Sequence, residues 1–151
     1  MSRPTPSTRA QYLHLLEITT RWMDNDAYGH VNNVVYYSYF DTIVNEWLIR
    51  RGLLDVAGGA LIGLVVETGC HYFEPLSYPG TITAGMRVGH LGNSSVRYEI
   101  ALFGEGRESA AAQGHFVHVY VDRATRRPAG LPQEWRRELE GLVIGAANAP
   151  G

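Results

Sequence analysis

The pattern of apolar and polar positions separates one helix-like segment from several strand-like segments. Between residues 34 and 51, apolar side chains recur at helical spacing, so that Tyr36, Phe40, Ile43 and Trp47 fall on one face. Further apolar residues flank that face and leave only a narrow, mostly polar stripe. A helix that is apolar over most of its circumference is surrounded by other structure. We therefore expect a long buried helix in this segment.

Strand-like patterns make up most of the remaining chain. An early segment is rich in strand formers, a second is a long apolar run, and three later segments alternate between apolar and polar positions. The predicted strands cover residues 12–22, 61–74, 81–91, 94–103 and 109–121, with turns at 75–80, 92–93 and 104–106 and a polar loop at 122–132 before a short helix at 132–142. A single sheet curled around one helix satisfies both periodicities. The pattern thus predicts an α+β fold in which five antiparallel strands wrap the long helix.

The length of 151 residues suits one domain with its own core. We expect a disordered lead at residues 1–10, a single domain at residues 11–142 and a flexible tail at residues 143–151. One face and the edges of the sheet would stay open in a single copy, and a long exposed edge strand promotes association. Pairing with a second copy closes these surfaces economically, so we predict at least a homodimer.

The composition is that of a globular protein, with 45% apolar and 19% charged residues. A formal charge of −2 gives no electrostatic attraction to nucleic acid or anionic lipid, so neither is an expected partner. No apolar run approaches the ~18 residues of a membrane span, and the polar N-terminus lacks a secretory signal. We therefore predict a cytoplasmic protein. All 13 basic residues are arginines, which excludes covalent catalysis by lysine.

The histidine and cysteine positions do not suit a metal site. The single cysteine, Cys70, lies in an apolar run that suits a buried thiol, and it excludes an internal disulfide and a cysteine-based zinc cluster. His115 and His118 are three residues apart in a predicted strand, so their side chains should point to opposite faces. The sequence also lacks a phosphate-binding loop, a dinucleotide-binding motif and Gly-x-Ser-x-Gly. We expect neither a metal nor a separate cofactor.

The segment just before the predicted helix concentrates carboxylates, a histidine and two asparagines around Gly29. Because helical spacing begins at Val34, Asn32 or Asn33 should cap the helix and satisfy N–H groups of its first turn. This end carries the positive pole of the helix dipole, where free N–H groups can stabilise a developing oxyanion. A tight turn at Gly29 would return the carboxylate of Asp26 towards the same point.

A carboxylate beside an oxyanion site is the minimum equipment for hydrolysing an acyl group. The carboxylate activates water or attacks the carbonyl directly, and the helix end holds the tetrahedral oxygen. A thiol has a pKa of about 8.5 and leaves without a strong general acid, whereas an amide would need better protonation of its leaving group or a metal. The arrangement therefore favours a thioester substrate.

The segment R-W-x-D-x-D-A-x-G-H-V-N-N-x-x-Y, from Arg21 to Tyr36, resembles the signature of the hotdog-fold acyl-CoA thioesterases of the 4-hydroxybenzoyl-CoA thioesterase family. The similarity covers about residues 12–138 and continues through 75–80, 92–95 and 122–132. The resemblance implies the hotdog fold, in which a five-stranded sheet surrounds one long helix. It also implies dimers whose sheets join edge to edge, often paired again into tetramers, with active sites at the dimer interface.

The resemblance implies that Asp26 is the catalytic carboxylate and that the backbone N–H near Asn33 is the oxyanion donor. Several family members have Tyr-His or Tyr-Pro where this chain has Asn32-Asn33. The His-Val-Asn-Asn version resembles acyl-carrier-protein thioesterases of the same fold, so the carrier, coenzyme A or acyl carrier protein, stays open. It also favours a direct role for His30.

Each candidate residue also has a structural explanation. An aspartate before glycine often bonds its own turn, which applies to Asp26, and capping of the loop explains Asp24 better than catalysis does. Asn32 is best explained as the helix cap. Glu67 interrupts an apolar strand, where a carboxylate either faces an interface or lines a pocket. We predict catalytic roles for Asp26, His30 and Asn33. Substrate contacts are predicted for Gly29, Asn32, Tyr36, Glu67, Ser94 and Ser95. The two serines would contact a pantetheine chain, although a role as turn residues explains them equally well.

The leading prediction is an acyl-CoA thioesterase that acts as a homodimer or a dimer of dimers. The first alternative is a hotdog-fold hydratase of enoyl thioesters, which would use a carboxylate and a histidine together at the opening of the helix. The second is a non-catalytic acyl-CoA-binding sensor. Such sensors commonly carry a DNA-binding segment, and this chain has no basic helix.

Overall fold

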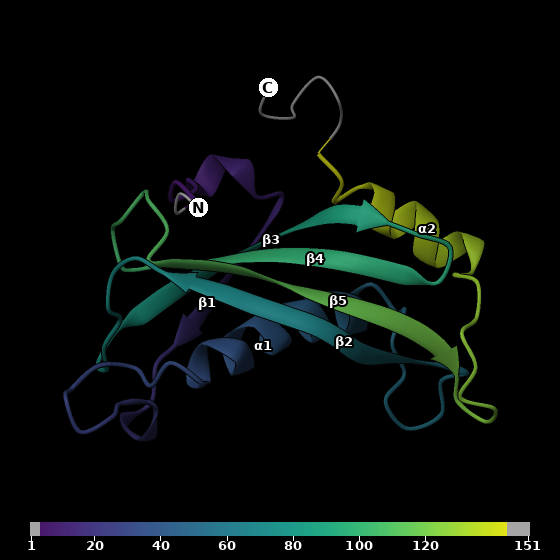
Figure 1. Ribbon diagram of the computed structural model, residues 1–151, viewed down its shortest axis with the longest axis horizontal. Coiled ribbons are helices and arrows are strands. Elements are labelled where there is room, and N and C mark those ends of the chain that lie inside the picture. The colour runs from purple at the N-terminus through teal and green to yellow at the C-terminus, as the bar shows by residue number, and fades with distance from the viewer. Residues whose placement is uncertain (1–3, 145–151) are drawn as a thin grey trace.

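One antiparallel sheet curls around one long helix in the computed structural model, which describes residues 4–144 (Figure 1). Five strands lie in the order β1-β3-β4-β5-β2, and each neighbouring pair is antiparallel. The predicted α+β fold, a five-stranded sheet around a central helix, is confirmed. The elements are β1 His14–Thr19, α1 Val35–Arg50, β2 Leu61–Tyr72, β3 Thr81–Leu91, β4 Ser95–Phe103, β5 Ala112–Asp122 and α2 Gln133–Glu140, with short 3-10 helices at Arg9–Gln11 and Trp22–Asp24.

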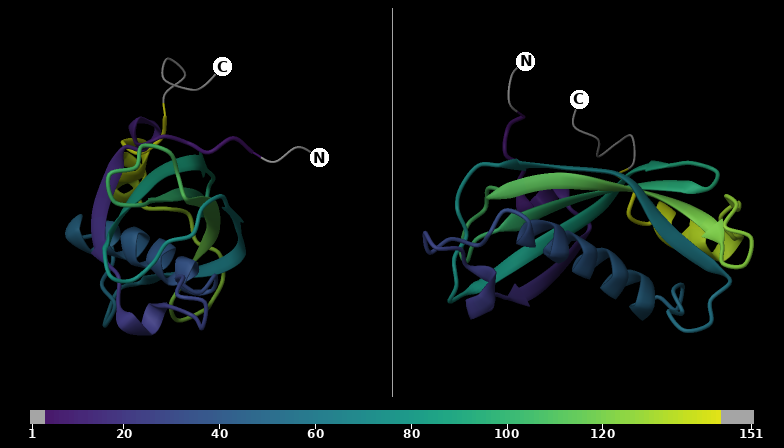
Figure 2. Two further views of the ribbon diagram at one scale, coloured as in Figure 1. Left: turned by 90° about the vertical axis from the view of Figure 1, so that its left-hand side faces the viewer. Right: turned by 60° about the horizontal axis from the view of Figure 1, so that its bottom comes forward.

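The helix α1 lies inside the curve of the sheet, as the end-on view in Figure 2 shows. Phe40, Ile43 and Val44 on this helix are completely buried, and they share one core with inward side chains of the sheet such as Met86 and Ile100. Removing a side chain of this size from water contributes about 1.5–3 kcal/mol. This shared core is therefore the main interaction that holds the helix against the sheet.

The ends of α1 agree with the sequence pattern to within one residue at each end. Gly52 has a φ of +71° and donates its N–H to the carbonyl of Ile49, which is the left-handed stop that glycine forms at little cost. Arg50 lies in the last turn, at the negative pole of the dipole. Among residues 4–144, no helix is both long and apolar enough to span a membrane.

The first strand ends earlier than the pattern predicts. β1 stops at Thr19, and the chain then turns at Arg21, whose backbone N–H donates to the carboxylate of Asp24 at 2.9 Å. This side-chain bond closes the 3-10 turn at Trp22–Asp24. It directs the segment before the helix away from the sheet, which β propensity alone could not indicate.

Part of the predicted disordered lead is packed in the structure. Ser7 is buried, its N–H donates to Oε1 of Gln113 at 2.8 Å, and its hydroxyl lies 2.8 Å from the hydroxyl of Tyr12. These bonds join a polar segment to side chains far along the sequence, so composition does not reveal them. Residues 1–3 of the predicted lead and 145–151 of the predicted tail lie outside the described residues.

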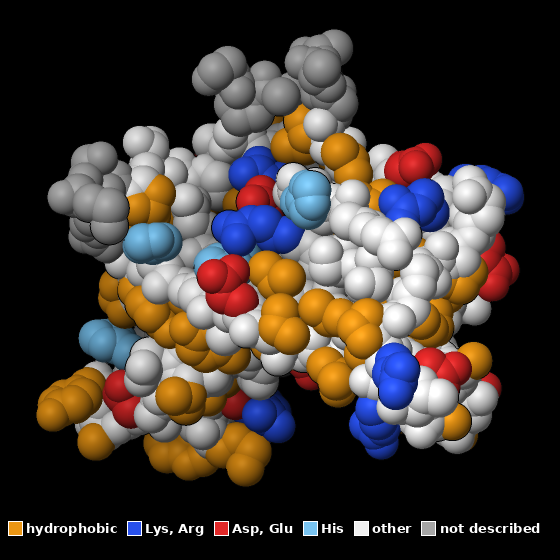
Figure 3. Space-filling model, turned by 45° about the vertical axis from the view of Figure 1, so that its right-hand side comes forward, with side chains coloured by type: hydrophobic (Ala, Val, Ile, Leu, Met, Phe, Trp, Pro, Cys, Tyr) orange, Lys and Arg blue, Asp and Glu red, His pale blue; other side chains and the backbone are white. Residues whose placement is uncertain are grey.

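The strands β1 and β2 form the two edges of the sheet. β2 is 12 residues long, and its Leu64, Val65 and Val66 are 41%, 50% and 60% exposed. A bulge interrupts its pairing with β5 between Val65 and Glu67. Hydrophobic side chains form a band across the face of the molecule seen in Figure 3. Exposed apolar residues on a long edge strand are typical of a surface that pairs with another chain.

Candidate active site

The carboxylate of Asp26 is held by the tight loop that it begins. The N–H of Asp26 donates to the carbonyl of His30 at 2.8 Å, and Gly29 turns the chain with a φ of +80°. Oδ1 of Asp26 accepts the backbone N–H groups of Tyr28 at 2.8 Å and His30 at 3.3 Å. Within residues 4–144, Oδ2 has no hydrogen-bond partner, so one oxygen orients the side chain and the other is available for chemistry.

Asp24 anchors this loop to α1 through Tyr39. Its carboxylate is 1% exposed and accepts bonds from the hydroxyl of Tyr39 at 2.6 Å and from Arg21 at 2.9–3.1 Å. Burial by itself would raise the pKa of Asp24, but the hydrogen bonds from Tyr39 and Arg21 outweigh it and hold that pKa below its ordinary value. Burial and the same carboxylate raise the pKa of Tyr39. Asp24 is therefore an anchor of the loop, as its capping explanation predicts.

The opening of α1 presents an unused backbone donor. Oδ1 of Asn32 accepts the N–H of Val34 at 3.1 Å, and the carbonyl of Asn32 accepts the N–H of Val35 at 2.9 Å. Asn32 therefore caps the turn that leads into the helix. The N–H of Asn33 has no acceptor within the described chain. The hydroxyl of Tyr72 donates to the carbonyl of Asn33 at 2.8 Å and ties this opening to the end of β2.

The loop and the helix opening meet in one cleft of about 340 Å³. Its walls include Asp26, His30 and Asn33, the three predicted catalytic residues. Tyr36, a predicted substrate contact, lines the same cleft, while Gly29 makes the turn behind it. A carboxylate oxygen, a free N–H at the positive end of a helix and an imidazole thus border a single space, which is the equipment that acyl transfer requires.

The remaining predicted contacts lie elsewhere in this chain. Glu67 is on the outer face of β2, where it meets His115 at 3.2 Å and Arg97 at 3.8 Å. Ser94 lies in the turn between β3 and β4, and Ser95 is the first residue of β4. This turn lies beside α2, at the opposite end of the molecule from the loop before α1 (Figure 1). None of these three residues lines the cleft of its own chain.

Five residues that line the cleft have no place in the sequence prediction: Val31, Tyr72, Phe73, Glu74 and Pro75. Tyr72 and Glu74 lie at and just after the end of β2, and Glu74 accepts a hydrogen bond from Arg107 at 2.8 Å. They lie near the opening of α1 because β2, far from it in the sequence, takes its place at the edge of the sheet. The one sequence signal is that the predicted strand 61–74 ends in two aromatic residues and a carboxylate, Tyr72, Phe73 and Glu74. His115 and His118 do point to opposite faces, since His118 is buried in the core and His115 is bonded to Glu67 outside it.

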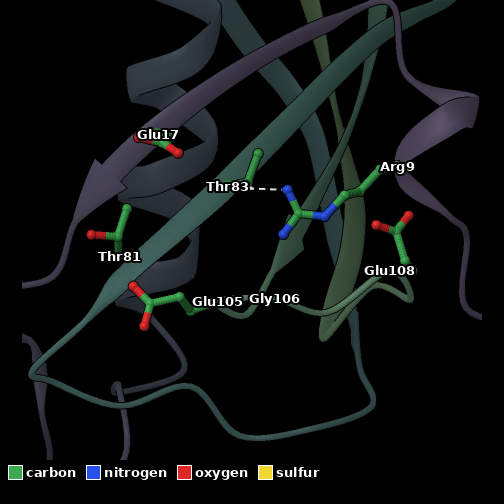
Figure 4. A pocket seen from close by; sticks show the side chains of 7 residues that line it. All are labelled: Arg9, Glu17, Thr81, Thr83, Glu105, Gly106 and Glu108. Carbon is green, nitrogen blue, oxygen red and sulfur yellow. Dashed lines mark hydrogen bonds between the residues drawn. The ribbon is translucent and has the colours of Figure 1, made fainter.

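A second cavity, of about 390 Å³, lies between the N-terminal segment, β1, β3 and the turn after β4 (Figure 4). Its centre is Arg9, whose guanidinium already donates to Oγ1 of Thr83 at 2.9 Å and to the carbonyls of Arg107 and Gly104 at 2.7 and 3.2 Å. Glu17, Glu105 and Glu108 complete the wall. Arg9 therefore joins the N-terminal segment to the sheet, and the residues predicted for catalysis lie elsewhere.

Solved structures include close and distant relatives of this chain. The PA5185 protein of Pseudomonas aeruginosa strain PAO1 is 57% identical, with a TM-score of 0.89 over 93% of this chain and 97% of that chain. The PA2801 protein of Pseudomonas aeruginosa, a proposed thioesterase, is 31% identical, with a TM-score of 0.79 over 85% of this chain and 98% of that chain. A search of curated proteins gave no match.

A more distant structure shares the fold alone. Slr0204, a 1,4-dihydroxy-2-naphthoyl-CoA thioesterase from Synechocystis, is 17% identical, with a TM-score of 0.74 over 83% of this chain and 93% of that chain. These likenesses agree with the expected hotdog fold. The model of the thioesterase-like superfamily matches residues 20–139, which include the whole candidate site. The match does not single out the 4-hydroxybenzoyl-CoA subfamily. The chain belongs to the thioesterase-like superfamily.

Proposed function

We propose that the protein hydrolyses an acyl-CoA thioester to a free acid and coenzyme A. The observation that carries this proposal is the single cleft shared by Asp26 and the opening of α1 at Asn33. The superfamily match supports thioester hydrolysis. Slr0204 and the gentisyl-coenzyme A thioesterase BH1999, a fold neighbour at 20% identity, favour coenzyme A over acyl carrier protein as the carrier. Such a substrate fits the cytoplasmic location that the sequence predicts.

In the proposed mechanism, the thioester carbonyl points its oxygen at the N–H of Asn33. Oδ2 of Asp26 then either removes a proton from an attacking water or attacks the carbonyl carbon itself. After direct attack and loss of the thiolate, the acyl group is held as an anhydride with Asp26, and water hydrolyses it to the free acid and the carboxylate. The N–H of Asn33 and the positive helix end stabilise the negative oxygen of the tetrahedral intermediate. The thiolate leaves without a strong acid because thiols have a pKa near 8.5. His30, on the same wall, positions the thioester.

We also propose that the working unit is a homodimer joined along β2, with tetramers as a further step. The support is the long apolar edge described above, with three exposed aliphatic side chains. Two copies paired edge to edge would form one continuous sheet and cover these residues. The cleft lies at the end of β2, so a partner joined there would approach it and could add the substrate contacts that Ser94 and Ser95 cannot make within one chain.

The test of this function is release of thiol from a panel of acyl-CoA and acyl-carrier-protein thioesters. Asp26→Asn should lower kcat at least ~100-fold, a typical loss for a missing catalytic base. Asp55→Asn is the matched control, because Oδ1 of Asp55 also accepts two backbone N–H groups of its own turn, at 3.1 and 3.2 Å, outside the cleft. Rates near those of the wild type for Asp26→Asn across the panel would exclude the mechanism.

A hydratase acting on enoyl thioesters is the second candidate, because Asp26 and His30 border the same cleft. Hydration would consume the conjugated double bond of crotonyl-CoA without releasing thiol. The absorbance of that bond and a thiol reagent, followed together with the wild-type protein, separate the two reactions. Tight acyl-CoA binding with neither signal would instead support the acyl-CoA sensor.

A further inference from the structure

The two peptide groups that meet at Asn33 leave one polar group without a partner. The carbonyl of Asn32 accepts the N–H of Val35 at 2.9 Å. The N–H of Val34 donates to Oδ1 of Asn32 at 3.1 Å, and the carbonyl of Asn33 accepts the hydroxyl of Tyr72 at 2.8 Å. These bonds restrain the rotation of both peptide planes. Within the described chain they leave only the N–H of Asn33 unused, and they fix the direction in which it points.

The helix α1 does not itself hold the carbonyl of Asn33. In a regular α-helix, the N–H of the fourth residue along, Tyr37, would donate to this carbonyl. The N–H of Tyr37 donates instead to the carbonyl of Val34 at 3.3 Å, in the tighter 3-10 pattern, and the helix begins at Val35. Of the three bonds around Asn33, two are therefore local to the opening of α1, and the bond from Tyr72 comes from another part of the fold.

The position of Tyr72 is fixed by both its backbone and its ring. Tyr72 is the last residue of β2, and the next two residues, Phe73 and Glu74, donate their N–H groups to the carbonyl of Ala111 at 2.8 and 3.0 Å. The ring of Tyr72 meets the buried ring of Tyr36 edge-on, with 4.9 Å between ring centres. The hydroxyl thus lies in place before a substrate binds, as a preorganised oxyanion site requires.

The hydroxyl of Tyr72 has a single proton, and the carbonyl of Asn33 is its best acceptor. Burial raises the pKa of Tyr72 above its ordinary value, and Cys70 and Tyr37 act in the same direction, so the hydroxyl stays protonated near neutral pH. The sulfur of Cys70 is a weak acceptor, and the hydroxyl of Tyr37 has a proton of its own to donate. While Tyr72 donates to Asn33, it cannot also donate to a substrate oxygen or protonate a leaving thiolate.

We propose that Tyr72 is a positioning residue for thioester hydrolysis, which aims the N–H of Asn33 at the thioester oxygen by holding the carbonyl of the same residue. This inference rests on the proposed function, and it adds a residue of β2 to a site whose other members precede or open α1. A hydrogen bond weakens steeply when its donor is misdirected. The oxyanion of the transition state depends on this donor more than the neutral carbonyl of the substrate does, so a misdirected N–H should lower kcat and spare KM.

The first test is Tyr72→Phe, which removes the hydroxyl and keeps the ring against Tyr36. On the acyl-CoA ester that the wild type hydrolyses best, this variant should lower kcat about tenfold, the scale of one lost hydrogen bond, with KM within about twofold of the wild type. Tyr12→Phe is the matched control, because the hydroxyl of Tyr12 lies 2.8 Å from that of Ser7, outside the cleft. The control should leave both constants unchanged.

A new donor at the same place separates positioning from packing. para-Aminophenylalanine at position 72 carries an N–H donor where tyrosine has its O–H, and it should recover most of the kcat that phenylalanine loses. A further readout needs no turnover. The amide signal of Asn33 in ¹⁵N-labelled wild type should shift when S-acetonyl-CoA, a ketone that cannot be hydrolysed, is added, and it should shift less in Tyr72→Phe.

Three results would overturn the inference. The first is an unchanged kcat in Tyr72→Phe with an equal shift of the Asn33 signal. The second is a loss mainly in KM, which would mean that Tyr72 contacts the substrate, and the third is a loss of kcat that para-aminophenylalanine does not recover. If Asp26→Asn stops thiol release in these cases, the proposed function survives and only the role of Tyr72 fails. A wild type that releases no thiol from any ester of the panel would remove the function and the inference together.

Discussion

Asp24 and Asp26 are two residues apart, yet their surroundings give them different properties. The carboxylate of Asp24 is buried and accepts hydrogen bonds from Arg21 and Tyr39. The carboxylate of Asp26 is half-buried at the wall of the cleft and keeps one oxygen without a partner in the described chain. A carboxylate whose oxygens all have hydrogen-bond partners holds the loop in place. A carboxylate with one oxygen left without a partner, beside an oxyanion donor, can act on a substrate.

The anchoring role of Asp24 predicts a particular dependence of stability on pH. The pKa of Asp24 is held below its ordinary value of about 3.9 in the folded state. A lowered pKa contributes stability that is complete above the unfolded pKa and is lost as the pH falls through the folded one. In Asp24→Asn, the free energy of unfolding should therefore decrease less steeply below about pH 4 than in the wild type, and it should be about 1–3 kcal/mol lower near pH 7.

Urea unfolding at several pH values measures both quantities for this variant. Asp122→Asn is an informative comparison, because hydrogen bonds from Thr125 and Ala124 also lower the pKa of Asp122 but the residue is only half-buried. That control should change the stability much less near neutral pH. Identical pH slopes for Asp24→Asn and the wild type would show that Asp24 does not carry the effect.

At the residue level, the sequence predicts the part of the site that is local in the chain. Asp26, His30 and Asn33 fall within one turn and one helix end, so spacing alone brings them together. Tyr72 enters the site because β2 lies beside the helix opening, which depends on strand order and not on any nearby residue. Ser94 lies away from the cleft of its own chain, so its predicted contact with the substrate stays a prediction.

At the level of elements, α1 and the strands β2 and β5 meet closely at Gly114. A Cβ on Gly114 would overlap the carbonyl oxygen of Gly69 and would lie 2.7 Å from Cε2 of Phe40. The overlapped atom of Gly69 belongs to the backbone and cannot rotate away as a flexible side chain can. The strand β5 would therefore have to move away from β2 or from the helix. The absence of a side chain here thus sets the distance between the helix and the two strands.

Gly114→Ala should therefore lower the free energy of unfolding by roughly 1–3 kcal/mol, the usual cost of overpacking. Gly104→Ala is the matched control, because its Cβ would meet Arg107 and Leu76 at ordinary distances of 3.5 and 3.6 Å. Urea unfolding of the two variants gives the comparison directly. Equal stability of Gly114→Ala and Gly104→Ala would mean that the strands tolerate the displacement.

The elements themselves are largely predictable, because each periodicity in the sequence has one physical origin. The apolar stripe of residues 34–51 exists because the sheet surrounds α1, and alternation in residues 94–103 exists because one face of β4 meets the core. The end of β1 is not predictable in this way. It depends on one hydrogen bond, from the backbone N–H of Arg21 to the carboxylate of Asp24, that competes with the backbone hydrogen bonds of the sheet.

At the level of the whole molecule, the strand β2 leaves one edge of the sheet unpaired within residues 4–144. Its exposed aliphatic side chains make pairing with a second copy favourable, and a two-fold axis through the middle of the strand would bring Val66 close to its own copy. The opposite edge, β1, is half as long, with six residues. This difference favours β2 as the edge at which two copies would form the dimer proposed above.

Val66→Lys should therefore convert the dimer to a monomer without unfolding it. The side chain is 60% exposed in one chain, so the change costs little there, but in a dimer it sets two like charges near each other across the paired strands. Sedimentation should show the mass of one chain, and thiol release should fall at least about tenfold if the site needs its partner. Because exposed charges are screened by salt, raising the ionic strength should restore part of both signals. Leu13→Lys, at a position 51% exposed beside β1, should leave mass and activity unchanged. A dimer that persists in Val66→Lys with full activity would place the interface elsewhere.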